Sequence, residues 1–191
     1  MIKVIVLISG NGSNLQALIE DAATSSNYQI SAVISNKVDA YGLIRAKNAN
    51  INTYVIKHEN EIIKIIHKGS PDLICLAGYM RILSKEFIQK VAVPILNIHP
   101  SLLPKHKGLH THQRAIEAGD KEHGATVHYV TEELDGGPII AQVRVPVFST
   151  DDSHTLAQRV LKAEHSLYPE VVRSFAQNRL KCDHEKTNVS A

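Results

Sequence analysis

Tryptophan is absent from the 191-residue sequence, and aromatic residues make up only 5% of it. Large aromatic side chains are the usual anchors of strong protein–protein interfaces, so we expect a monomer or a weak homodimer. Cysteine is scarce too, with only Cys75 and Cys182. Two cysteines so far apart do not make a disulfide framework and suit a reducing compartment.

A strong charge of either sign is also missing. The sequence has 21 Lys and Arg against 19 Asp and Glu, a formal net charge of +2, which does not indicate a nucleic-acid-binding surface. No apolar stretch approaches the length of a membrane-spanning helix, and the run after Lys3 is too short for the core of a signal peptide. We therefore expect a cytoplasmic protein whose partners include neither nucleic acid nor a membrane.

The composition that is present is that of a globular protein, with 43% hydrophobic and 21% charged residues. A chain of this length buries enough apolar surface to fold without metal or disulfide cross-links. We expect one domain over residues 1–181 and a polar C-terminal tail at residues 182–191.

Short apolar runs alternate with segments of helical spacing along the first hundred residues. The runs expected to be buried strands are residues 4–8, 29–35, 51–56, 72–77 and 95–98, and the expected helices are residues 14–23, 40–49, 59–68 and 85–91. This alternation predicts an α/β fold with a doubly wound, mostly parallel, Rossmann-like sheet.

The pattern changes after Pro100. A polar loop leads to a helix at residues 113–118, and strands at 125–130 and 138–145 flank a Gly-rich turn, which predicts an antiparallel C-terminal part. A long helix follows at residues 153–176, and we expect it to be interrupted near Pro169.

Four polar segments follow predicted strands, namely residues 9–14, 78–83, 97–99 and 131–137. Because ligands bind at the carboxyl ends of the strands in open α/β sheets, we expect these segments to meet in one site.

The segment Ser9-Gly10-Asn11-Gly12-Ser13-Asn14 joins a strand to a helix. Its glycines permit a tight turn, and backbone N–H groups at the start of the helix can hold a phosphate. It lacks the third glycine of a dinucleotide fingerprint and the lysine of a Walker A loop. An ordinary tight turn remains the alternative to a phosphate site.

Asn97 and His99 lie two residues apart and therefore on one side of a strand end. An amide can donate a hydrogen bond to a developing oxyanion, and an imidazole can act as an acid or a base. Asp135, in the Gly-rich turn, is a carboxylate that would favour the protonated imidazole. The alternative is that Asn97 and His99 only satisfy backbone groups in the turn before Pro100.

The sequence has 11 histidines, which raises the question of a metal site. His106, His110 and His112 share one loop, but no H-E-x-x-H motif or nearby cysteine accompanies them, and the loop carries lysines. We expect no metal, and interpret these histidines as mobile or substrate-contacting. Arg81 either binds an anionic ligand or forms a surface ion pair.

Five segments together resemble the phosphoribosylglycinamide formyltransferases. They are VLISGNGSNLQALI at residues 6–19, LAGYMRILS at 76–84, LNIHPSLLP at 96–104, GLHTHQRAIEAGD at 108–120 and ELDGGPII at 133–140. The resemblance implies a formyltransferase fold and transfer of a formyl group from 10-formyltetrahydrofolate, as co-substrate, to the amine of glycinamide ribonucleotide in purine biosynthesis.

The resemblance also implies roles for individual residues. The catalytic residues would be Asn97, His99 and Asp135, with Asn97 and protonated His99 stabilising the oxyanion and Asp135 assisting a proton shuttle. The ribonucleotide would bind to Gly12, Ser13, Asn14, Pro100 and Glu164. The folate would bind to Met80, Arg81, Ile82, Leu83, Asn97, Thr131, Glu132, Glu133, Leu134 and Asp135. His110 would lie in a loop that covers the site.

Three other interpretations share some of these features. A methionyl-tRNA formyltransferase would carry an added C-terminal domain and a basic surface, whereas this chain is short and nearly neutral. A formyltetrahydrofolate hydrolase would carry an N-terminal regulatory domain, whereas the first strand here begins near residue 2. A non-catalytic nucleotide-binding module would not need Asn97, His99 and Asp135 together.

Overall fold

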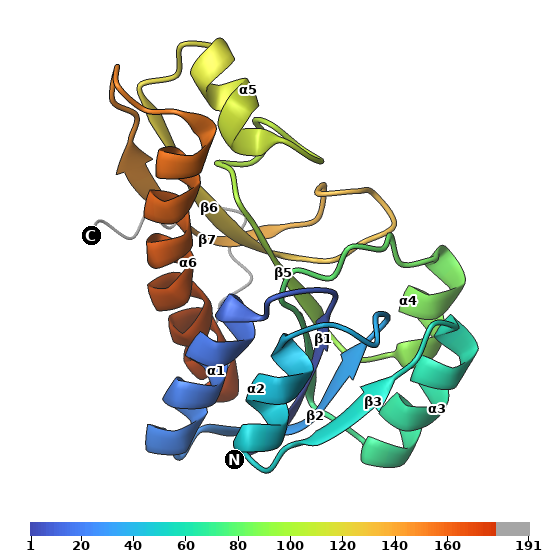
Figure 1. The fold of residues 1–191 in the computed structure, drawn as a ribbon. Coiled ribbons are helices and arrows are strands. Elements are labelled where there is room, and N and C mark those ends of the chain that lie inside the picture. Colours follow the sequence, from blue (N-terminus) through green and yellow to red (C-terminus); the bar gives the residue numbers. More distant parts are fainter. Residues whose placement is uncertain (179–191) are drawn as a thin grey trace.

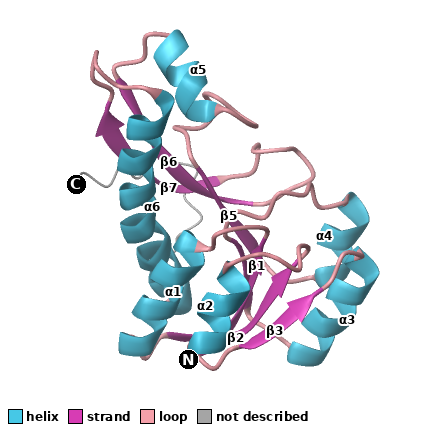
Figure 2. Cartoon of the chain, in the orientation of Figure 1, coloured by secondary structure: helices cyan, strands magenta, loops and turns pink. Residues whose placement is uncertain are grey.

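Residues 1–178 are described in the computed structural model of the chain, and they form one seven-stranded sheet with helices on both faces (Figures 1 and 2). The tail predicted at residues 182–191 lies outside the described residues. The strands are β1 (Ile2–Ile8), β2 (Tyr28–Ser35), β3 (Asn52–Val55), β4 (Leu73–Leu76), β5 (Ile95–His99), β6 (Glu122–Tyr129) and β7 (Ile139–Pro146). The helices are α1 (Ser13–Thr24), α2 (Gly42–Asn48), α3 (Glu59–Gly69), α4 (Lys85–Val91), α5 (Thr111–Glu117) and α6 (Ser153–Ala176).

The strand order is β3-β2-β1-β4-β5-β6-β7. Strands β1 to β5 are mutually parallel, while β6 runs antiparallel to β5 and β7 antiparallel to β6. The predicted parallel sheet with an antiparallel C-terminal part is therefore confirmed. The chain leaves β1 toward β2 on one side and returns to β4 on the other, so the loops after β1 and β4 lie at the point where the strand order reverses.

The continuous apolar run of β1 is explained by burial on both faces of the sheet. Val4, Val6 and Ile8 enter one hydrophobic cluster, and Ile5 and Leu7 enter the other. Since successive side chains of a strand point to opposite faces, a strand between two layers of helices must be apolar at every position.

The helices divide between the two faces according to their place in the chain. Helices α1, α2, α5 and α6 contribute to the cluster on one face, and α3 and α4 to the cluster on the other. Figure 1 shows α1, α2 and α6 together on one side of the sheet, with α3 and α4 on the opposite side. This arrangement leaves the carboxyl ends of β1, β4 and β5 open at one edge.

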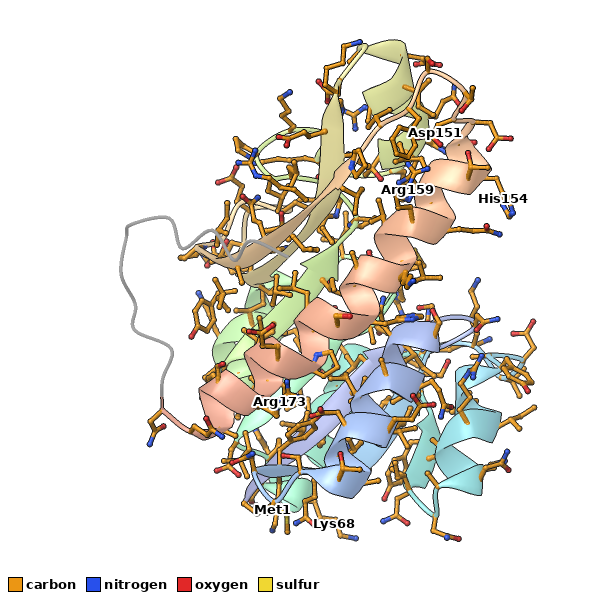
Figure 3. The ribbon with its side chains drawn as sticks, turned by 90° about the vertical axis from the view of Figure 1, so that its left-hand side faces the viewer. Met1, Lys68, Asp151, His154, Arg159 and Arg173 are labelled. Carbon is orange, nitrogen blue, oxygen red and sulfur yellow. The ribbon has the colours of Figure 1, made fainter. Side chains whose placement is uncertain are left out.

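Helix α6 runs without a break from Ser153 to Ala176, so the interruption predicted near Pro169 was wrong. Pro169 is buried, and its neighbour Tyr168 is fully buried with its hydroxyl within 3.0 Å of the Leu76 carbonyl and 3.1 Å of the Leu96 carbonyl. Packing against the sheet therefore outweighs the single hydrogen bond that proline removes. Figure 3 shows the helix running from Asp151 and Arg159 at its start to Arg173 near its end.

Candidate active site

Hydrogen bonds connect the loops after β1, β2 and β4. The backbone N–H of Ser9 donates to the Gly78 carbonyl at 3.1 Å. The Ser9 hydroxyl donates to Asn36 Oδ1 at 2.6 Å and accepts from the Met80 N–H at 2.8 Å. Ser9 is only 2% exposed, so a single buried hydroxyl holds three strand ends together. The predicted meeting of the segments after β1 and β4 is confirmed.

The loop after β1 is held by close packing against α2. Gly12 has a left-handed φ of 74° and caps the start of α1. A Cβ built on Gly12 would lie 2.7 Å from the Cα of Gly42, so no side chain fits between the two backbones. Arg45 of α2 fixes the loop from outside by donating to the Asn11 carbonyl and side-chain oxygen, each at 2.9 Å. The packing against Gly42 and the hydrogen bonds from Arg45 therefore hold the backbone N–H groups at the start of α1 in place.

Asn14 and Glu164 meet across 150 positions of sequence, because α1 packs against α6. Asn14 Nδ2 donates to Glu164 Oε2 at 2.7 Å. Burial raises the pKa of Glu164 to about 7, and the hydrogen bond from Asn14 opposes that rise only in part. The side-chain oxygen of Asn14 is buried without a hydrogen-bond partner among the described residues. An unpaired acceptor beside a perturbed carboxyl group is typical of a ligand site.

Asn97, His99 and Asp135 lie together at the end of β5. His99 Nδ1 is 3.5 Å from Asp135 Oδ2, and the two side chains are only 8% and 7% exposed. His99 Nε2 lies 3.1 Å from the backbone carbonyl of His106. Both ring nitrogens thus face oxygens that only accept hydrogen bonds. Pro100 follows directly and turns the chain away from the strand.

Asp135 sits in the loop between β6 and β7 with a left-handed φ of 49°. This conformation is uncommon outside glycine, although Asp adopts it more readily than most residues. The carboxylate accepts a hydrogen bond from the Gly108 backbone N–H at 2.9 Å. The end of β5 at His99, the loop before α5 at Gly108 and the loop after β6 therefore meet at this carboxylate.

His128 is a site residue that the sequence did not reveal. It pairs with Asn97 across the antiparallel β5–β6 register. Its Nε2 lies 3.2 Å from Asn97 Nδ2 and 3.8 Å from Asp135 Oδ1. The available signal was that polar Thr126 and His128 alternate with apolar Ala125 and Val127, which predicts a strand with polar side chains on one face.

The segment after β4 presents apolar side chains at the surface. Met80 and Ile82 are 66% and 73% exposed, whereas Leu83 belongs to the core beneath them. The Arg81 guanidinium donates to the Lys57 carbonyl. Exposed apolar side chains at the carboxyl end of a strand fit a partly apolar ligand.

The segment after β6 is tied to its surroundings by two surface ion pairs. Glu132 pairs with Lys85 at 2.9 Å and Glu133 with Lys107 at 2.7 Å. Thr131 and Leu134 are exposed. Surface pairs of this kind contribute little stability, so the loop can rearrange at small cost.

The loop before α5 reaches the site through its backbone. His110 is exposed at the start of α5, while the contacts to the site come from the His106 carbonyl and the Gly108 N–H. The His106 side chain instead pairs with Asp120 at 2.7 Å. The loop therefore lies against His99 and Asp135, although His110 itself does not supply these contacts.

His112 and His123 form a separate pair beside this loop, with His123 Nε2 3.2 Å from His112 Nδ1. Burial lowers the pKa of His123 to about 4, so the ring is neutral near neutral pH. Within residues 1–178, no three metal-ligating side chains are grouped so as to hold a metal ion. In the same residues no helix is long and apolar enough to span a membrane.

Comparison of the sequence with known protein families shows to which family the chain belongs. The sequence profile of the formyl transferase family matches residues 2–172. The chain belongs to the formyl transferase family. The match covers all of the sheet and most of α6, so it includes every element that positions the site of this formyl transferase.

Individual members agree in sequence and structure. A phosphoribosylglycinamide formyltransferase of Escherichia coli strain K12 is 50% identical over 189 residues, which cover 94% of this chain and 89% of that protein. A solved phosphoribosylglycinamide formyltransferase from Coxiella burnetii is 48% identical with a TM-score of 0.89, covering 93% of this chain and 88% of its own. One from Anaplasma phagocytophilum is 41% identical with a TM-score of 0.92, covering 100% and 99%. The predicted formyltransferase fold is confirmed.

Proposed function

We propose that the chain is a phosphoribosylglycinamide formyltransferase. It transfers the formyl group of 10-formyltetrahydrofolate to the amine of 5-phosphoribosylglycinamide in de novo purine biosynthesis. The observation that carries the proposal is the cluster of Asn97, His99 and Asp135, at the edge where the loop before α1 offers an anion site. The names of the relatives, 50% identical in the case of the E. coli protein, support the same activity.

The reaction is a direct transfer between the two substrates. The substrate amine attacks the formyl carbon, and the carbonyl oxygen becomes an oxyanion. The Asn97 amide donates a hydrogen bond to this oxygen, and the charge of the His99 imidazolium stabilises it. The bond from carbon to N10 of the folate then breaks, which completes the transfer.

Asp135 serves this step in two ways. Its carboxylate, 3.5 Å from His99 Nδ1, lies where it can pair with the imidazolium that stabilises the oxyanion. It also orients a water molecule that carries the proton from the attacking amine to the leaving N10, so the proton balance closes without a covalent intermediate on the enzyme.

The ribonucleotide binds at the start of α1. Backbone N–H groups of Gly12, Ser13 and Asn14 hold its phosphate, since the positive end of a helix dipole favours an anion. Pro100 borders this site, and the buried carboxyl of Glu164 contacts the ribonucleotide.

The folate binds between two loops. The segment Met80, Arg81, Ile82 and Leu83 forms one wall. The segment Thr131, Glu132, Glu133, Leu134 and Asp135 forms the other, and Asn97 lies between them. The loop that carries His110 closes over both substrates, and it already contacts His99 and Asp135 through backbone groups.

The enzyme acts without a metal, as a cytoplasmic monomer or weak homodimer, and its domain extends over residues 1–181. Size-exclusion chromatography with light scattering, at several protein concentrations, tests the oligomeric state. A stable dimer at all concentrations contradicts this part of the proposal.

The direct test mixes the protein with glycinamide ribonucleotide and 10-formyltetrahydrofolate and follows the release of tetrahydrofolate. We expect release only when the ribonucleotide is present. Release without the ribonucleotide would indicate a hydrolase, and tight ribonucleotide binding without release would indicate a non-catalytic binding protein. Either result overturns the proposal.

A further inference from the structure

We propose that His128 is a positioning residue that fixes which way the side-chain amide of Asn97 faces. The inference deepens the proposed function, on which it rests. It starts from two contacts of one imidazole ring, namely Nδ1 with the Tyr129 carbonyl at 2.9 Å and Nε2 with Asn97 Nδ2 at 3.2 Å.

The first contact sets the tautomer of His128. A backbone carbonyl only accepts hydrogen bonds, so the Nδ1 atom facing it must carry the proton. In the neutral ring, Nε2 then has a free lone pair and can only accept. The backbone of β6 itself therefore determines what His128 offers to its neighbour on β5.

The second contact sets the orientation of Asn97. Because Nε2 accepts, the amide must present its NH2 group to His128, as it does. A flipped amide would bring its oxygen against the Nε2 lone pair and lose the hydrogen bond. One of the two N–H bonds of Asn97 is thereby engaged, and the second remains for the oxyanion of the transferred formyl group.

The contact with Asn97 requires His128 to be neutral, because only the neutral ring has an acceptor at Nε2. A protonated ring would donate from Nε2 and attract the oxygen of Asn97 instead. The His128 side chain is 3% exposed, and burial lowers its pKa. The charged and titratable groups around it are Asp135, which favours the protonated ring, and His99 and Lys107, which oppose it. Desolvation is the largest of these effects, so the neutral ring is favoured.

The two histidines of the site face different hydrogen-bond partners. His99 faces two acceptors. His128 faces one acceptor and one donor and is suited to be neutral. The Asp135 carboxylate lies 3.5 Å from His99 Nδ1 and 3.8 Å from His128 Nε2. Because this carboxylate is close to both rings, the difference between them comes from burial and from their other hydrogen-bond partners.

Two substitutions separate positioning from simple packing. His128→Gln places an amide oxygen near the former Nε2 and keeps an acceptor for Asn97. His128→Asn places its amide near the former Nδ1 and keeps the Tyr129 contact but loses the acceptor. We expect kcat of the Asn variant to fall by about 10- to 100-fold, with a much smaller loss for Gln and with KM for the ribonucleotide nearly unchanged in both.

His123→Asn is the matched control, since His123 is a buried histidine of the same strand whose hydrogen bond goes to His112. Thermal unfolding of all three variants measures the cost of removing a buried ring. If Asn and Gln at position 128 have equal kcat, or if kcat follows only the melting temperature, His128 has a structural role and the inference is wrong.

A second measurement does not depend on turnover. In protein labelled with 15N-histidine, we expect the His128 ring at neutral pH to be protonated at Nδ1 and unprotonated at Nε2. Protonation at Nε2 overturns the inference even if the enzyme is active. Absence of formyl transfer by the wild type would overturn the proposed function, while the NMR result would still decide the tautomer.

Discussion

At the scale of single residues, the carboxylate of Asp135 has the largest number of roles in the site. It accepts from the Gly108 N–H and lies beside His99 and His128. In Asp135→Asn the negative charge is lost while the size is kept, so we expect kcat to fall by about 100-fold or more and the ribonucleotide dissociation constant to change little. Steady-state kinetics and calorimetry measure the two quantities. The exposed Asp39→Asn is the control, and equal losses of affinity and turnover would show a structural role instead.

The buried carboxyl group of Glu164 should make the stability of the fold depend on pH. Its pKa rises from 4.5 to about 7 on folding, so between those values the unfolded chain releases a proton that the folded protein keeps. Stability due to this group is therefore present at acidic pH and lost as pH rises toward 7. We expect Glu164→Gln to gain stability relative to the wild type between pH 4.5 and 7, by at most about 3 kcal/mol.

Urea denaturation of the ligand-free protein across this pH range tests the Glu164 prediction. Glu170→Gln, at an exposed position of the same helix, controls for the general effect of removing a carboxylate. A stability difference between Glu164→Gln and the wild type that stays constant with pH contradicts the prediction.

Single residues differed in how far the sequence could place them. Asn97 and His99 followed from the two-residue alternation of a strand, which is a local property. His128 required knowledge that β6 pairs with β5 and in which register, and strand pairing is a long-range property. The contact of Asn14 with Glu164, 150 positions away, depends in the same way on how α1 packs against α6.

At the scale of elements, the start of α2 supports residues 9–14, the segment that we propose as the phosphate loop. A Cβ on Gly42 would lie 2.5 Å from Ile8 Cδ1 and 3.2 Å from the Gly12 Cα. We expect Gly42→Ala to displace the loop slightly and raise KM for the ribonucleotide about 3- to 10-fold, equivalent to about 1 kcal/mol of binding, with little change in kcat. In the control Gly69→Ala the new Cβ would meet Ile5 Cδ1 at an ordinary 3.5 Å. Equal KM values for both variants and the wild type would contradict this account.

Elements were easier to predict than their ends. Alternating apolar runs and helical stripes located every strand and helix described here, because burial imposes those periods. The predicted break near Pro169 was wrong, since local propensity did not include the buried packing of α6. Strand β6 also begins at Glu122, earlier than the predicted residue 125, because pairing with β7 extends to Pro146.

At the scale of the whole molecule, the sheet separates two hydrophobic clusters, and the face formed by α3 and α4 lies away from the phosphate loop. Ile66 of α3 is 1% exposed, so Ile66→Ala should lower the free energy of unfolding by about 2–5 kcal/mol. At a temperature where the variant is folded, KM should match the wild type. Denaturation and kinetics, with the half-buried Ile65→Ala as control, check both expectations, and a changed KM would show that this face is coupled to the site.

The central claim is that the formyl group passes directly from the folate to the ribonucleotide amine at Asn97, His99 and Asp135. Following a 13C-labelled formyl donor by NMR tests it most directly. The account predicts that all the label appears as the N-formyl group of the ribonucleotide. Label recovered as free formate, or left on the folate while the ribonucleotide is bound, would contradict it.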